Sequence, residues 1–191
     1  ADLYRWERAY FMEHCVRNVC GVEPEPSAID RLEEELTALA GRLETAGRSL
    51  VHRDLQSRNV MIRNGEPVLI DFQGMRFGTP FYDLGSLLCD PYMTWTDEER
   101  LDLLRFYHDL TECPGDWETC QRIFWDASAQ RLMQACGAFG FLALQKGLRP
   151  FLEHIPAGLA NLIHAAKRSG ALPRLEELSR RCLRKRFRMA R

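Results

Sequence analysis

No stretch of this chain is apolar over the roughly 20 residues that a membrane-spanning helix needs. Its first residues, ADLYRWERAYF, have neither the basic start nor the apolar core of a secretory signal. Low-complexity tracts and internal repeats are also lacking, which argues against a fibrous or disordered protein. With 191 residues, of which 46% are hydrophobic, the sequence predicts a single globular lobe over residues 1–191 in the cytoplasm.

Paired cysteines are lacking as well. The seven cysteines include no CxxC pair, and no cysteine or histidine pair has the spacing of a zinc finger. An odd number of cysteines without a repeating framework is typical of reduced thiols in a cytosolic protein. We therefore expect free thiols and no structural zinc.

A large excess of either charge is missing, because 26 basic and 27 acidic residues leave a net charge of -1. The exception is local, since residues 180–191 hold seven basic and no acidic side chains. A basic helix end usually lies on a solvated face and complements the helix dipole. We expect neither a nucleic-acid partner nor a membrane partner.

Helical periodicity dominates residues 1–47. Ser27 with Asp30 three residues later resembles a capping box that begins a helix, and Gly47 is the expected stop. Between these signals the apolar residues step by three and four, which predicts one buried stripe on a helix. The residues of this stripe are Ile29, Leu32, Leu36, Leu39 and Leu43.

Residues 93–191 are also helical in pattern. Thr96 and Glu99 form a second capping box ahead of an apolar run. Long helical patterns follow at about 117–146, 156–168 and 173–189. The fold class predicted from the whole sequence is mainly α with a small β-hairpin insert.

The insert occupies residues 48–92, where the Asn64-Gly65 pair is a strong signal for a hairpin turn between NVMIR and VLID. If these two residues form the turn, the facing pairs are Arg63 with Glu66, Met61 with Val68, and Asn59 with Ile70. Asn59 and Asp71 would then lie side by side at the base of the hairpin.

An amide oxygen and a carboxylate in this arrangement suit Mg²⁺, which keeps part of its hydration shell in phosphoryl-transfer sites. Asp54 lies five residues before Asn59 in a polar segment, so its carboxylate can reach a position near the metal pair. It is therefore the candidate base that would orient an incoming hydroxyl. Each of these residues alone is more typical of a turn or a cap. Their combined spacing favours a site made of Asp54, Asn59 and Asp71.

At these residues the sequence resembles the aminoglycoside phosphotransferase family of the protein-kinase-like fold. The catalytic loop of that family reads HxDxxxxN and is followed, after a hairpin, by a metal-binding aspartate; His52, Asp54, Asn59 and Asp71 match it. More narrowly, HRDLQSRNVMI with IDFQ and YDLGSLL is similar to the bacterial branch of anomeric kinases that act on N-acetylmuramic acid and N-acetylglucosamine in cell-wall recycling.

The resemblance implies a protein-kinase-like C-terminal lobe that uses ATP and Mg²⁺ to phosphorylate a hydroxyl of a small molecule, most closely an amino sugar or N-acetylated sugar. Asp54 would be catalytic, and Asn59 and Asp71 would hold the metal. His52 would brace the loop, and Asp83 would support it as a helix N-cap. Candidate phosphate or substrate contacts are Arg58, Gln56, Gln73, Arg76 and Tyr82.

Three other functions stay open: an aminoglycoside or other small-alcohol kinase, a protein kinase, and a non-catalytic kinase-like binding module. Against a protein kinase, Gln56 replaces the usual lysine, DFQ replaces DFG, and the connection from Asp71 to Asp83 leaves no room for an activation loop. The binding module is considered because the sequence has no Gly-rich phosphate loop and no VAIK-like lysine. We expect an N-terminal nucleotide lobe, absent from these residues, to complete the enzyme.

Overall fold

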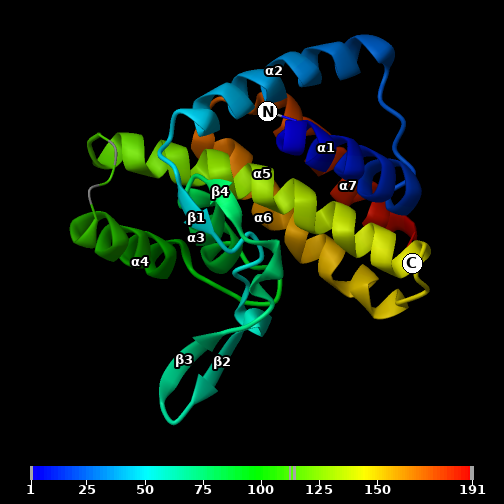
Figure 1. The fold of residues 1–191 in the computed structure, drawn as a ribbon. Coiled ribbons are helices and arrows are strands. Elements are labelled where there is room, and N and C mark those ends of the chain that lie inside the picture. Colours follow the sequence, from blue (N-terminus) through cyan, green and yellow to red (C-terminus); the bar gives the residue numbers. More distant parts are fainter. Residues whose placement is uncertain (1, 112, 114, 190–191) are drawn as a thin grey trace.

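The computed structural model describes residues 2–111, 113 and 115–189 (Figure 1). The basic run at 180–191 therefore lies partly outside the described residues. The described part of the chain is mainly helical and carries two short antiparallel ribbons. The predicted fold class is confirmed.

Helix α5 (Trp117–Leu144) forms the centre of the core, and most of its residues are buried. Its neighbours are α1 (Asp2–Phe11), a π-helical stretch (Met12–Val19), α3 (Phe81–Leu88) and α6 (Ile155–Ser169). Figure 1 shows α6 running beside α5. Among the described residues, no helix combines the length and the apolar character that a membrane crossing requires.

Glycine permits the close packing of α3 on α5. A Cβ atom on Gly85 of α3 would lie 2.8 Å from the Cα and Oγ atoms of Ser128 on α5, which is shorter than real Cβ contacts. Any side chain at this position would push α3 outward. Gly85 thus sets the distance between α3 and α5.

Helix α2 (Pro26–Glu44) contains the predicted leucine stripe, and its four leucines are buried while Ile29 is partly exposed. The capping box predicted at Ser27 and Asp30 is wrong. Glu25 is the N-cap, without a side-chain cap, because Pro26 at the first helical position starts the helix before Ser27. Gly47 lies beyond the helix end with a φ of +86°.

The capping box at Thr96 and Glu99 is confirmed at the start of α4 (Asp97–Leu110), with both reciprocal hydrogen bonds present. The later helical patterns correspond to α5, α6 and α7 (Pro173–Met189), with a 3-10 stretch at Arg149–His154 before α6. Each of the seven cysteines, all within the described residues, is a thiol and not half of a disulfide.

The hairpin of β2 (Val60–Arg63) and β3 (Glu66–Leu69) has the predicted register. Asn64 and Gly65 form its turn with φ values of +54° and +84°, as a two-residue hairpin turn requires. Figure 1 shows this hairpin extending away from the helices. A second ribbon joins β1 (Ser49–Val51) to β4 (Arg76–Gly78). Its second strand was not predicted.

Candidate active site

A cavity of about 780 Å³ lies where the catalytic loop meets α1, α3 and α5. Asp54, Asn59 and Asp71 all line it, and Arg131 of α5 lies among them. Trp6 of α1 also lines the cavity and is 53% exposed. The cavity therefore has charged groups beside an aromatic surface.

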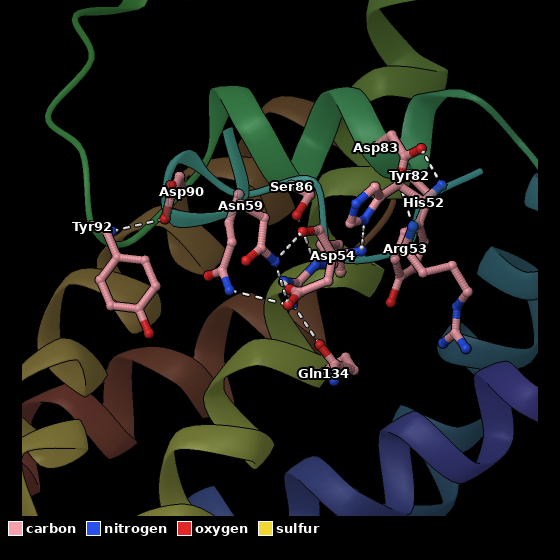
Figure 2. Close-up of polar contacts among 12 residues, drawn as sticks. His52, Arg53, Asp54, Asn59, Tyr82, Asp83, Ser86, Asp90, Tyr92 and Gln134 are labelled. Carbon is pink, nitrogen blue, oxygen red and sulfur yellow. Dashed lines mark hydrogen bonds and ion pairs between the residues drawn. The ribbon is translucent and has the colours of Figure 1, made fainter. Parts of the chain in front are cut away.

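The catalytic loop begins after β1 and is held at its backbone by Asp83. The carboxylate of Asp83 accepts hydrogen bonds from the backbone nitrogens of His52 (2.6 Å) and Arg53 (2.8 Å), as Figure 2 shows. His52 is buried, and its Nε2 atom lies 2.9 Å from the carbonyl oxygen of Ile70. These contacts tie the loop to α3 and to the base of the hairpin.

The predicted role of Asp83 as a helix N-cap is wrong. The N-cap of α3 is Pro80, and Asp83 lies in the first helical turn. Its carboxylate is aimed at the catalytic loop instead of the first amides of its own helix. The backbone amides of His52 and Arg53 need hydrogen-bond acceptors. The Asp83 carboxylate supplies them and therefore does not cap its own helix.

Asp54 is the loop residue whose carboxylate reaches the cavity, with a side chain that is 42% exposed. Its Oδ1 atom lies 2.5 Å from a guanidinium nitrogen of Arg131. Its Oδ2 atom accepts hydrogen bonds from the side-chain amides of Asn59 (3.0 Å) and Gln56 (3.1 Å). The carboxylate is thus fixed in one orientation by three donors.

Asn59 and Asp71 lie together at the base of the hairpin, because the backbone nitrogen of Ile70 donates to the carbonyl of Asn59 at 3.1 Å. The amide nitrogen of Asn59 is used by Asp54, at the backbone carbonyl (2.8 Å) and at the carboxylate. This leaves the amide oxygen of Asn59 as the group available for a ligand. Asp71 adopts a left-handed conformation, and its Oδ1 atom accepts a hydrogen bond from Gln73 at 2.7 Å.

An amide oxygen and a carboxylate fit Mg²⁺, since this hard cation prefers oxygen ligands and fills its remaining positions with water and phosphate. They do not form a closed metal cage. Within the described residues, no group of three or more histidine, cysteine, aspartate or glutamate side chains could hold a metal ion.

The far end of the catalytic loop is held by Asp90, which is 1% exposed. Its carboxylate accepts hydrogen bonds from the backbone nitrogens of Ser57 (2.7 Å) and Tyr92 (2.9 Å), and Figure 2 shows the contact with Tyr92. The guanidinium of Arg58 lies 3.9 Å from the centre of the Tyr92 ring. Burial raises the pKa of Tyr92, and Arg58 partly opposes this shift.

Of the five candidate contacts, Gln56, Arg58, Gln73 and Arg76 line the cavity. Tyr82 does not. It is 3% exposed, and its hydroxyl donates a hydrogen bond to Glu7 at 2.9 Å. Tyr82 thus lies outside this cavity, because α3 turns its ring into the core, and its suggested contact with a substrate stays a prediction.

Sequence reasoning missed Arg131, Asp90 and Glu7. A signal for Arg131 does exist, because it is the single charged residue between positions 127 and 144. A lone charge in an apolar helical pattern indicates a buried partner. That partner, Asp54, lies 77 positions away in sequence, so no local pattern could identify it.

The fold and the loop geometry define a lobe of the protein-kinase-like type. The chain belongs to the phosphotransferase enzyme family, whose sequence model matches residues 2–122. The family resemblance drawn from the loop motifs is therefore confirmed.

Three curated relatives share the name N-acetylmuramate/N-acetylglucosamine kinase. The protein from Neisseria meningitidis serogroup B is 32% identical over 133 residues, which are 67% of this chain and 40% of that protein. The protein from Pseudomonas aeruginosa is 26% identical over 179 residues, covering 91% of this chain and 53% of the relative. The one from Pseudomonas putida is 27% identical over 134 residues. The chain thus spans about half the length, or less, of these relatives.

Proposed function

We propose that the full-length protein transfers the γ-phosphoryl group of ATP to a hydroxyl of an amino sugar or N-acetylated sugar. The observation that carries this proposal is the carboxylate of Asp54, which is exposed to the cavity and held in one orientation. Family membership supports the reaction class, and the names of the relatives support the acceptor class.

Asp54 has capacity for one further hydrogen bond. A carboxylate offers about four acceptor positions, and Arg131, Asn59 and Gln56 use three of them. The fourth suits an acceptor hydroxyl, whose proton Asp54 would take late in a loose transition state. Positioning matters more than basicity in such a reaction.

Asn59 and Asp71 would hold Mg²⁺, which neutralises phosphate charge when bound. These residues supply the acceptor and metal side of the reaction. The sequence offers no Gly-rich loop or VAIK-like lysine for the nucleotide phosphates. We propose that a further lobe of the full-length protein supplies them.

The metal assignment predicts different responses to Mg²⁺. We expect Asp71→Ala to raise the Mg²⁺ concentration for half-maximal rate by at least about 10-fold more than Asn59→Ala, because losing a charged ligand from a divalent site costs more than losing a neutral one. Asn59→Ala should mainly lower kcat, since Asn59 also holds Asp54. Mg²⁺ titration of the rate measures both effects.

Glu66→Ala is the control for this titration, because Glu66 lies on the exposed hairpin next to the turn and does not line the cavity. Its Mg²⁺ dependence should match that of the unmodified protein. Equal or reversed Mg²⁺ requirements in the Asp71 and Asn59 variants would reject the assignment.

The acceptor prediction is that an N-acetylhexosamine gives the highest kcat/KM among amino sugars, N-acetylated sugars, aminoglycosides and choline-like alcohols. Amide side chains and an exposed aromatic ring suit sugar hydroxyls and the apolar face of a pyranose. The charged side chains that line the cavity disfavour a polycation: Arg53, Arg58, Arg76 and Arg131 against Asp54, Asp71 and Asp90. ATP consumption by the full-length protein measures the ranking.

Trp6→Ala tests the aromatic part of this site. It should raise KM for the sugar by about 5-fold or more, as the loss of a stacking surface worth about 1 kcal/mol or more implies, with KM for ATP unchanged. Phe106→Ala, at an exposed aromatic outside the cavity, is the control. A preference for aminoglycosides would favour the alternative acceptor, and turnover of serine or threonine peptides alone would refute the small-molecule function.

A further inference from the structure

Glu7 of α1 is a carboxylate that is fully buried. Its Oε1 atom is paired with a guanidinium nitrogen of Arg53 and accepts a hydrogen bond from the hydroxyl of Tyr82 at 2.9 Å. Its Oε2 atom accepts from the side chain of Gln130 at 2.9 Å. A buried charge needs such compensation, and here the donors come from the catalytic loop, α3 and α5.

The Tyr82 hydroxyl is committed to this arrangement. Burial, followed by the nearby Glu7 carboxylate, raises the pKa of Tyr82 well above its ordinary value. The phenol therefore stays protonated and donates to Glu7. Tyr82 also lies under the guanidinium of Arg53, 5.8 Å from the ring centre, so the three side chains form one cluster that is buried at Glu7 and Tyr82.

Arg53 is the residue through which this cluster reaches the active site. Its φ of +73° places a non-glycine residue in the left-handed region, which is costly unless the surroundings impose it. Asp83 holds its backbone nitrogen and Glu7 holds its guanidinium. The next residue is Asp54, and the two side chains leave the loop in different directions (Figure 2).

Helix α5 links the two ends of this arrangement. Its consecutive residues Gln130 and Arg131 bind Glu7 and Asp54, respectively. A shift of Glu7 would therefore change the conformation of Arg53 directly. Through α5 it would also change the hydrogen bond between Arg131 and Asp54. The carboxylate of Glu7 is the negative charge paired with the guanidinium of Arg53.

We propose that Glu7 is a positioning residue. Its carboxylate binds the guanidinium of Arg53, keeps the backbone of Arg53 in the left-handed conformation, and so fixes the direction of the Asp54 carboxylate. The catalytic consequence rests on the proposed function. The conformational consequence does not, because it concerns the loop itself.

The test uses Glu7→Gln in the full-length protein, since glutamine keeps the size and an acceptor oxygen for Tyr82 but removes the charge. We expect kcat to fall by about 10-fold or more, because small misplacement of a catalytic group is costly, while KM for ATP stays within about 3-fold. Amide hydrogen exchange at residues 52–54 should accelerate by about 10-fold, with α6 unchanged. Glu13→Gln, at an exposed glutamate on the following helical stretch, should alter neither measurement.

Arg53→Gln breaks the same ion pair at its less buried partner. This variant replaces Glu7→Gln in the test if Glu7→Gln does not fold. If the pair acts as a unit, the double variant should be no slower than the slower single variant. A folded Glu7→Gln or Arg53→Gln protein with unchanged kcat and unchanged amide exchange at residues 52–54 would overturn the proposal. Losses of kcat in the two single variants that simply multiply in the double variant would overturn it as well. If the unmodified protein phosphorylates no acceptor, the proposed function fails, and the exchange data alone then decide the role of Glu7.

Discussion

Asp54→Asn is expected to lower kcat of the full-length protein by at least about 10²-fold while leaving the affinity for MgATP within a few-fold. Asparagine keeps the shape of the side chain but cannot take the proton of the acceptor hydroxyl. The nucleotide is not affected to the same extent, because Asp54 contacts the acceptor side of the reaction in the proposed mechanism. Steady-state kinetics and calorimetry with MgATP measure the two quantities.

Stability must be measured in the same variant, because Asp54 is also the partner of Arg131, whose side chain is only 6% exposed. A buried guanidinium that loses its counter-charge destabilises the fold. Thermal melting will separate this effect from catalysis. Asp109→Asn, at an aspartate that is 65% exposed on α4, is the matched control. Near-normal turnover in folded Asp54→Asn would assign the base to another residue.

The second large effect concerns the 191 residues on their own. Catalysis of phosphoryl transfer depends on positioning and charge stabilisation on both sides of the γ-phosphate. In the proposed mechanism Asp54, Asn59 and Asp71 supply one side. We therefore expect these residues to bind MgATP with a dissociation constant on the order of millimolar or weaker, to show no measurable transfer to any sugar, and to regain activity when joined to a nucleotide lobe.

The same fragment should associate with itself, because both ribbons carry exposed apolar side chains. Ile62 on β2 is 68% exposed and Phe77 on β4 is 67% exposed. Clustered apolar surface of this kind promotes association. Sedimentation of the fragment should show oligomers that Ile62→Ser with Phe77→Ser reduces, whereas Glu66→Ser, at an exposed polar position of the same hairpin, should not.

Calorimetry with MgATP on the fragment is the decisive measurement for its nucleotide site. A micromolar dissociation constant would show that these residues hold a complete nucleotide site. Transfer by the fragment alone would contradict the need for a second lobe.

The features that could be predicted from sequence depend on contacts between near neighbours. Asn64-Gly65 specifies the hairpin turn, and the turn specifies the register. The capping box of Thr96 and Glu99 is likewise local. At Ser27 a similar pattern failed, because Pro26 started the helix earlier. Local rules therefore succeed where no stronger local preference competes.

The contacts around the loop depend on residues far apart in sequence. Arg131 meets Asp54 across 77 positions, and Gln130 meets Glu7 across 123. No spacing rule relates such positions, because helix packing alone sets their distance. The turn of Tyr82 into the core was equally unpredictable, since it follows from the packing of α3 on α5.

The sequence by itself determined the family, the mainly helical class and the hairpin that brings Asn59 next to Asp71, since each follows from a motif or from periodicity within a short segment. The tertiary structure decided which partner each charged group meets. Arg131 pairs with Asp54, Asp83 accepts hydrogen bonds from the backbone amides of the loop, and Glu7 pairs with Arg53. The physical reason is that a buried charge is stable only beside its partner. That partner is found only when the helices have packed.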